Sequence, residues 1–183
     1  MAKVLVPLAQ GCEELEAITI VDLLRRADIK VVTAGLTDEP VTASHGVTII
    51  PDKPLDEALK EDFDMVVLPG GLPGADNLNN DARIHALLKK MVQSGKFAGA
   101  ICAAPIVLAK SGLLSGKKAT SYPGFLDKMG LPDVTFTGQA VERDGKIITS
   151  RGPGTAMDFA LEVIEMLKGK DTRNTVEKAL VRS

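Results

Sequence analysis

The sequence predicts an α/β fold, a three-layer sandwich in which helices cover both faces of a mostly parallel sheet. Short apolar runs alternate along the chain with helical patterns, which is typical of strand–helix–strand units. The runs are apolar at consecutive positions, as in strands that are buried on both faces. Right-handed crossovers then bring the carboxyl ends of the strands to one edge of the sheet, where the functional sites of such folds lie.

Four apolar runs are the predicted strands, and several of them end at small residues or at Pro-Gly: residues 4–6, 30–34, 65–68 and 97–101. Helical patterns lie between or after them at residues 13–26, 83–93 and 103–110. A last long helix follows Thr155, which is spaced from Asp158 as in a capping box. Two further segments, 41–50 and 141–149, are predicted hairpins because each turns at an X-Gly pair.

Length and charge limit the classes of protein that the chain can represent. Its 183 residues predict one domain over residues 1–183, at roughly 150 residues per domain. The 22 Lys and Arg residues against 24 Asp and Glu give a net charge of -2, so no dedicated nucleic-acid-binding surface is expected. No apolar run approaches the ~18 residues of a membrane span, and the N-terminal run is too short for a signal peptide. We therefore expect no membrane association and a cytoplasmic location.

Motifs for metals and nucleotide cofactors are missing from the sequence. Cys12 and Cys102 are the only cysteines, so neither a disulfide scaffold nor a structural zinc site is expected. The phosphate-binding P-loop motif does not occur. The segment 152–154 opens a helix with two glycines, but Met157 stands where a dinucleotide fingerprint has its third glycine. We therefore expect no metal and no cofactor.

Cys102 is the candidate nucleophile. It follows the predicted strand 97–101 and precedes a helix, with Ala100 and Ala104 two residues away on either side, as in a nucleophile elbow. Small residues are needed there because a sharp strand-to-helix turn leaves no space for side chains. The turn directs the thiol to the sheet edge and places it over N–H groups at a helix start, where the dipole favours the thiolate. The alternative is a buried cysteine that acts only as a small apolar residue.

Glu16 is the candidate proton-transfer residue. It shares a helical stripe with Ile20, Leu23 and Ala27, and the rest of that stripe is apolar. A carboxyl on a buried stripe must be hydrogen bonded, and desolvation raises its pKa. Because this helix follows the first strand, Glu16 is expected at the same sheet edge as Cys102. The alternative is a residue at the edge of the stripe that reaches water.

Two glycine-containing segments follow other strands. Residues 68–71 bring Gly70 and Gly71 to the sheet edge, where the backbone can approach a ligand and offer N–H donors to an oxyanion. Residues 150–155 join a hairpin to the last long helix. Taken singly, the first segment is also explained as a plain turn and the second as a loop with a helix N-cap.

Together these segments resemble the ThiJ/PfpI superfamily, and within it the Parkinsonism-associated protein deglycase branch with its YajL-like bacterial members. The resemblance extends through nearly the whole chain. It rests on the order and spacing of five segments: Gly11-Cys12-Glu13-Glu14-Leu15-Glu16, Val21-Asp22-Leu23-Leu24-Arg25-Arg26, Val67-Leu68-Pro69-Gly70-Gly71, Ala100-Ile101-Cys102-Ala103-Ala104-Pro105 and Thr149-Ser150-Arg151-Gly152-Pro153-Gly154-Thr155. Each segment alone is weak, but their combination is specific.

The resemblance implies a flavodoxin-like fold and a homodimer whose subunits meet near the active sites. It implies that Cys102 is an oxidisable nucleophile and that Glu16 is its protonated partner, which hydrogen-bonds the sulfur and stabilises a sulfinate. The amides near Gly70, Gly71 and Ala103 would form the oxyanion site.

The resemblance also places other residues at the border of the pocket. Arg26 and the Gly152-Pro153 loop match such positions, and in the family the loop comes from the partner subunit. Tyr122 stands where some members carry a histidine, so a Cys-His peptidase or amidotransferase dyad is not supported. His45 stands where the best-known relatives have an arginine.

The site residues and the resemblance together predict a cysteine-dependent glyoxalase or protein deglycase with a protective role in oxidative stress. Its substrates would be methylglyoxal, glyoxal and their early adducts on proteins or nucleotides. The Cys102 thiolate would attack the aldehyde carbon, and Glu16 would shuttle protons through an enediol step. The alternative is a redox sensor and stress chaperone whose Cys102 oxidises to a sulfinate without substrate turnover. A cysteine peptidase would follow from superfamily analogy alone.

Overall fold

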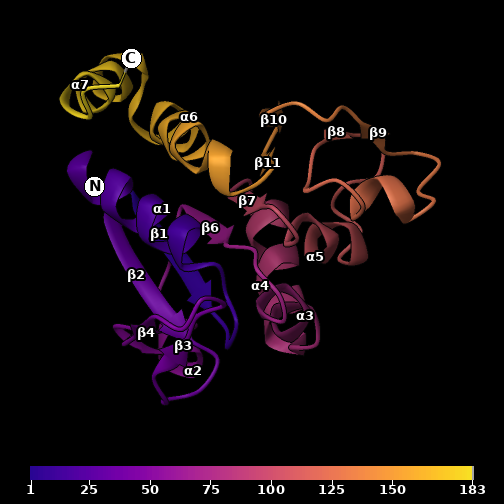
Figure 1. The fold of residues 1–183 in the computed structure, drawn as a ribbon, viewed down its shortest axis with the longest axis horizontal. Helices are drawn as coiled ribbons and strands as arrows, with labels where there is room; N and C mark the ends of the chain where they lie inside the picture. Colours follow the sequence, from indigo (N-terminus) through magenta and orange to yellow (C-terminus); the bar gives the residue numbers. More distant parts are fainter. Residues whose placement is uncertain (183) are drawn as a thin grey trace.

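A mostly parallel sheet runs through the centre of the computed structural model, which describes residues 1–182 (Figure 1). Within these residues the sheet has seven strands in the order β10-β11-β7-β6-β1-β2-β5. Every neighbouring pair is parallel except β10 with β11, which lie antiparallel at one edge. The strands are β1 (Lys3–Leu8), β2 (Lys30–Gly35), β5 (Lys53–Pro54), β6 (Met65–Leu68), β7 (Phe97–Ile101), β10 (Val141–Asp144) and β11 (Ile147–Ser150).

Helices cover both faces of this sheet, so the three-layer α/β prediction is confirmed. One face carries α1 (Glu14–Arg26) and α6 (Ala156–Lys168), and α7 (Lys170–Ala179) packs against α6. The other face carries α2 (Leu55–Ala58), α3 (Gly74–Asn79), α4 (Ala82–Gln93) and α5 (Pro105–Lys110). No helix within residues 1–182 is long and apolar enough to cross a bilayer.

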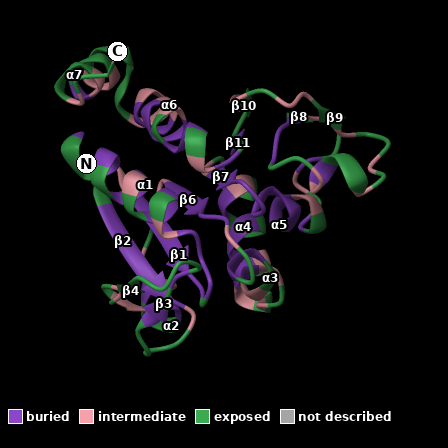
Figure 2. Cartoon of the chain, in the orientation of Figure 1, coloured by how far each residue is buried: buried purple, intermediate pink, exposed green. Residues whose placement is uncertain are grey.

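The strands build two hydrophobic cores, one on each face. In β1, Val4 and Val6 join the core beneath α1 and α6, whereas Leu5 joins the core beneath α4 and α5. This alternation follows from the two-residue period of a strand. Both cores are apolar, which explains why the predicted strands have no polar face. Figure 2 shows the result as a buried sheet between helices whose outer faces are exposed.

Both predicted hairpins are present. β3 (Val41–Thr42) pairs with β4 (Thr48–Ile49), and β10 pairs with β11. The second hairpin also extends the central sheet, since β11 runs parallel to β7, a pairing that its short turn did not reveal. A small parallel sheet of β8 (Lys118–Ala119) and β9 (Thr135–Phe136) had no sequence signal because each strand has only two residues.

The predicted capping box at the start of α6 is wrong. Thr155 precedes the helix, but its side chain makes no capping hydrogen bond to it. The Thr155 hydroxyl instead lies 2.7 Å from the Ser150 hydroxyl and accepts from the Gly152 N–H at 3.1 Å. Asp158 is bound by Arg182 at 2.7 Å. The residue pair therefore stabilises two tertiary contacts rather than the helix start.

The strand order reverses direction at β1. From β1 the chain passes to β2 on one side, and it later returns to β6 on the other side. The loops that follow β1 and β6 therefore diverge, and such a reversal opens a crevice at the carboxyl ends of the strands. β7 lies next to β6, so the loop that follows it reaches the same crevice.

Candidate active site

Cys102 lies on a sharp turn directly after β7. Its φ of 63° is in the left-handed region, which non-glycine residues rarely adopt. The turn is held on both sides, because the Cys102 N–H donates to the Ser150 carbonyl at 2.9 Å and the Cys102 carbonyl accepts from the Tyr122 N–H at 2.8 Å. Ala100 and Ala104 are fully buried against it. The predicted nucleophile elbow is therefore present, with α5 beginning at Pro105.

Glu16 lies in the first turn of α1 and is fully buried. Its stripe partners Ile20, Leu23 and Ala27 are buried as well, so the predicted core-facing stripe is confirmed. Glu16 Oε2 accepts a hydrogen bond from the Gly70 N–H at 2.8 Å. The other oxygen, Oε1, is buried without an oxygen or nitrogen partner among the described residues.

Gly70 allows the acid and the thiol to meet. A Cβ atom at position 70 would lie 2.6 Å from the Cys102 Cβ and 2.9 Å from Glu16 Oε2. The two side chains thus approach each other across a space that only glycine leaves open, and the approach of Cys102 lowers the pKa of the Glu16 carboxyl in opposition to burial. The strand register explains the approach, because Leu68 pairs with Ala100 across β6 and β7.

Burial dominates the ionisation of both groups. Desolvation raises the pKa of the Glu16 carboxyl to about 7, against the hydrogen bond from the Gly70 N–H and the approach of Cys102, which both lower it. Desolvation likewise raises the pKa of the Cys102 thiol to about 12, and the Glu16 charge adds to the shift. The prediction that a helix start favours the thiolate is wrong here, because burial outweighs it. Between these two pKa values the pair of groups therefore holds one proton, which the carboxyl and the sulfur share.

Backbone N–H groups face the sulfur from two loops. The amides of Gly71 and Ala103 lower the pKa of the Cys102 thiol, against the larger effect of burial. Gly71 has a φ of 86° and passes so close to α1 that a Cβ there would lie 2.4 Å from the Glu13 nitrogen. The Gly70 N–H is already bound to Glu16, so its predicted place in the oxyanion site is wrong.

Tyr122, Gly152 and Pro153 line a cleft of about 300 Å³ beside the elbow. The loop passes close to the ring, since a Cβ atom at Gly152 would lie 3.2 Å from Tyr122. The Ser150 and Thr155 hydroxyls hold the loop through the contacts described above. Within one subunit the chain's own loop and its own Tyr122 therefore form adjacent walls next to Cys102.

Arg26 does not border this pocket within the subunit. It lies at the opposite end of α1 from Glu16, where it pairs with Asp22 at 2.8 Å and faces Lys168 and Asp171 near α7. Ten residues of helix separate the two ends by about 15 Å, so the predicted place of Arg26 at the pocket border stays a prediction for the assembled dimer.

Sequence reasoning missed the contact between α1 and the β3–β4 hairpin. Glu14 accepts from the His45 N–H at 2.9 Å, and the Ser44 hydroxyl lies 3.2 Å from Glu13 and 3.1 Å from Glu14. The ligand atoms of Glu13, Glu14 and His45 lie within 4.8 Å of one another. The carboxylates already accept hydrogen bonds from the hairpin, so these residues tie it to α1. Adjacent acids at a helix start were the available signal, but the helix dipole alone is enough to explain acids in a first turn.

Cys12 differs from Cys102 in its surroundings. It is fully buried beneath the loops that follow β1 and β6, and burial raises the pKa of its thiol to about 11. This placement is typical of a cysteine that acts as a small apolar core residue.

Comparisons with known proteins agree with this fold. The DJ-1/PfpI family model matches residues 2–166. The chain is 46% identical over 178 residues to Protein dj-1beta of Drosophila melanogaster, which covers 97% of this chain and 95% of that protein. The crystal structure of Drosophila DJ-1beta matches with a TM-score of 0.95 at 44% identity and covers 100% of this chain and 98% of that one.

Other relatives extend the comparison. A Caenorhabditis elegans protein named glutathione-independent glyoxalase DJR-1.2 is 37% identical over 179 residues, 98% of this chain and 95% of that protein. The chain spans only 46% and 40% of the length of Protein DJ-1 homologs A and B of Arabidopsis thaliana. The flavodoxin-like fold and the family resemblance of the sequence are both confirmed. The chain therefore belongs to the DJ-1/PfpI family.

Proposed function

We propose that the chain is a cysteine-dependent glyoxalase that converts methylglyoxal to lactate and glyoxal to glycolate, and that it also acts as a deglycase on their early adducts with proteins or nucleotides. One observation carries the proposal: a strained elbow thiol meets a buried carboxyl whose pKa is about 7. Proton transfer is most effective when the pKa of the catalytic group lies near ambient pH. The name of the C. elegans relative, a glutathione-independent glyoxalase, supports the same class of reaction.

The raised thiol pKa assigns the first step to Glu16 as a general base. Its carboxylate takes the proton from Cys102, and the sulfur attacks the aldehyde carbon to give a hemithioacetal. The amides of Gly71 and Ala103 stabilise the developing oxyanion, which then takes a proton. The proton that Glu16 takes from the thiol is the one that the oxyanion then receives, so Glu16 is again a carboxylate.

The following steps are an internal oxidation and reduction, so they need no cofactor. Glu16 removes the hydrogen from the former aldehyde carbon to give an enediol, and the neighbouring carbon is then protonated. The resulting thioester is hydrolysed by water, which releases the hydroxy acid and restores the thiol. The cleft of about 300 Å³ beside Tyr122 is large enough for two- and three-carbon aldehydes and for their early adducts.

Hydroxy-acid release by purified protein tests this proposal. We expect lactate from methylglyoxal with the native chain and a loss of at least a hundredfold with Cys102→Ala. Cys12→Ala is the matched control, because it removes the other buried thiol, and it should retain activity. Equal rates for the native chain and Cys102→Ala would remove the enzymatic proposal.

A redox sensor with stress-chaperone activity is the second candidate, favoured by the two amides that face the sulfur and could hold sulfinate oxygens. Two equivalents of hydrogen peroxide would convert the thiol to the sulfinic acid and release two of water. The raised thiol pKa leaves little thiolate for peroxide to attack, which favours turnover as the main role. Intact mass after mild peroxide treatment distinguishes the two: a two-oxygen adduct confined to Cys102 supports sensing, and an unmodified thiol contradicts it.

We also propose that the protein is a cytoplasmic homodimer. Both cysteines are free, which suits a reducing compartment. Large apolar side chains are half exposed at the start of α1 and in the hairpin tied to it: Leu15, Ile18 and Val47. Apolar side chains that gather on a surface in this way are typical of an interface.

A further inference from the structure

Two short helices follow the two loops whose amides face the Cys102 sulfur. α3 begins at Gly74, shortly after Gly71, and α5 begins at Pro105, shortly after Ala103. The two helices have six residues each and pack against each other. Because the amides of Gly71 and Ala103 are the oxyanion donors of the proposed reaction, the relative position of α3 and α5 determines where these donors lie.

Each loop is bonded to the helix that follows it. The Gly71 carbonyl accepts from the Ala75 N–H of α3 at 2.8 Å, and the Ala103 carbonyl accepts from the Ile106 N–H of α5 at 3.4 Å. A helix of six residues is only about 9 Å long, so a contact at its far end is still close to the loop. Displacement of either helix would therefore move the peptide groups that face the sulfur.

His85 joins the other ends of these two helices. Its Nε2 lies 2.7 Å from the carbonyl oxygen of Asn79, the last residue of α3. Its Nδ1 lies 2.7 Å from the hydroxyl oxygen of Ser111, the residue that follows α5. A carbonyl oxygen can only accept, so Nε2 carries a hydrogen and donates it to Asn79. One imidazole ring therefore connects the C-terminal ends of both helices.

Both partners of the ring belong closely to their helices. Ser111 is buried, and its hydroxyl also lies 2.8 Å from the Val107 carbonyl, one turn earlier in α5. The Asn79 carbonyl lies at the end of α3, where carbonyl groups have no donor within the helix, and His85 supplies one. The ring therefore acts on the backbone of α3 and, through Ser111, on α5.

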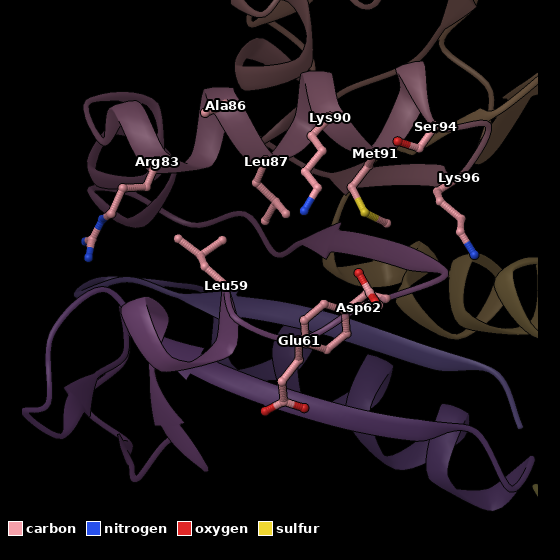
Figure 3. Close-up of a pocket in the computed structure, with 11 residues that line it drawn as sticks. Leu59, Glu61, Asp62, Arg83, Ala86, Leu87, Lys90, Met91, Ser94 and Lys96 are labelled. Atoms are coloured by element: carbon pink, nitrogen blue, oxygen red, sulfur yellow. The ribbon is translucent and has the colours of Figure 1, made fainter.

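The helix that carries His85, α4, is itself anchored in the fold. Ile84 and Leu88 are fully buried in the core beneath α4. Leu87 and Met91 are directed from α4 toward the segment that leads into β6, across a groove of about 500 Å³ (Figure 3). His85 thus holds α3 and α5 against a helix that is fixed independently of the candidate site.

We infer that His85 is a positioning residue for the candidate site. It sets the relative position of α3 and α5, and with it the positions of the Gly71 and Ala103 amides. The inference rests on the proposed function only for its effect on rate. Displaced oxyanion donors stabilise the transition state less and leave substrate binding unchanged, so loss of His85 should lower kcat without raising KM.

Amide chemical shifts test the positioning directly and need no turnover. His85→Phe keeps a planar ring and removes both nitrogen atoms, so the ¹⁵N-labelled variant should show shifted signals for the Gly71 and Ala103 amides. His85→Gln restores a donor toward Asn79 and should shift them less. Val31→Ala is the matched control, because Val31 is buried on the opposite face of the sheet and its truncation lowers stability away from α3 and α5. Unchanged Gly71 and Ala103 signals in His85→Phe, or equal shifts in Val31→Ala, would overturn the inference.

The division of the effect between kcat and KM tests the consequence for the proposed reaction. With methylglyoxal, His85→Phe should lower kcat about tenfold, less than the loss from removing an oxyanion donor outright, and leave KM unchanged. Ser111→Ala should also lower kcat, but it should have no further effect when combined with His85→Phe, because the contact between the two side chains is already absent.

The outcomes separate this inference from the proposed function. Val31→Ala should retain the native kcat, whereas a native kcat in His85→Phe would overturn the inference even if lactate is released. If the native chain releases no lactate, the proposed reaction fails, but shifted Gly71 and Ala103 amides in His85→Phe would still support the positioning.

Discussion

Glu16 retains its proton into the neutral range because burial raises its pKa to about 7 from 4.5. The folded protein binds this proton more tightly than the unfolded chain does. Its contribution to stability is therefore complete below pH 4.5 and is lost as the pH rises through 7. We expect the free energy of unfolding of Glu16→Gln, relative to the native chain, to rise by on the order of 3 kcal/mol across this range. Urea unfolding at several pH values measures this difference in unfolding free energy. If the unfolding free energies of the two proteins changed in parallel with pH, the prediction would be contradicted.

The same acid controls the ionisation of the thiol. After burial, the charge of Glu16 is the largest cause of the raised pKa of Cys102. Glu16→Gln removes the charge and keeps much of the shape, so the thiol should ionise at lower pH. Absorbance of the thiolate at about 240 nm, corrected with Cys102→Ala, follows the titration. Glu13→Gln, a neighbouring carboxyl at the start of α1, should leave it unchanged; an equal shift in both variants would rule out a direct effect of Glu16.

Gly70 is required by sterics and not by an unusual φ angle. In Gly70→Ala the new Cβ would lie 2.6 Å from the Cys102 Cβ and 2.7 Å from the Ile101 carbonyl oxygen, so the elbow must shift. We expect a loss of about 1–3 kcal/mol in the free energy of unfolding, together with loss of activity. Gly154→Ala provides the comparison, because no atom lies within 4 Å of its added Cβ. Chemical denaturation of both variants decides the matter, and equal stabilities would show that the contact at position 70 relaxes freely.

The placement of the candidate site residues could be predicted from the sequence better than the pKa values of their side chains. The small-residue spacing around Cys102 and the stripe position of Glu16 are local patterns, and the structure confirms both geometries. The thiol pKa and the use of the Gly70 amide depend on how deeply separate loops pack together, which no local pattern contains. The catalytic roles of these residues stay predictions.

The loop after β11 depends on one hydroxyl. Thr155 Oγ1 accepts from the Gly152 N–H and lies 2.7 Å from Ser150 Oγ, and all three residues are buried. Thr155→Val keeps the shape but leaves the Gly152 amide without its partner, which should cost about 1–3 kcal/mol in unfolding free energy. Thr175→Val on exposed α7 removes a comparable hydroxyl at the surface and should cost less than about 0.5 kcal/mol. Thermal unfolding of the pair tests this, and equal costs would refute the importance of the network.

The position of a helix or strand could be predicted where its apolar pattern extended over several residues. The stripe of α1 and the apolar runs of β6 and β7 predicted these elements correctly. The place of Arg26 at the pocket border rests on the resemblance alone, because within one subunit this residue lies at the far end of α1. Two-residue strands such as β8 and β9 depend on contacts made by the folded chain, so periodicity could not reveal them.

At the scale of the whole molecule, the sequence predicted the layers but not the order of the strands. Alternating strands and helices imply a parallel sheet, but the pairing of β11 with β7 brings together segments that are remote in the sequence. That pairing places Ser150 beside Ile101 and so positions the Gly152 loop next to Cys102. The most distant parts of the candidate site were therefore the least predictable from sequence.

The proposed dimer has a test at this scale. Ile18 is half exposed on the outer face of α1, so Ile18→Glu should disrupt an interface there without affecting the core. Light scattering coupled to size exclusion should give a dimer mass for the native chain and a monomer mass for the variant. Phe136→Glu, a change at a partly exposed aromatic residue in β9, should remain dimeric. A monomeric native chain would disprove the proposed assembly.

The loops that surround the thiol come from the whole length of the chain, from Glu16 near one end to Gly152 near the other. During synthesis, Cys102 leaves the ribosome before the segment that carries Gly152 and Thr155. A nascent chain at that stage holds the cysteine without the β11 backbone that fixes its turn. The order of translation therefore delays maturation of the proposed nucleophile until the C-terminal part of the protein has emerged.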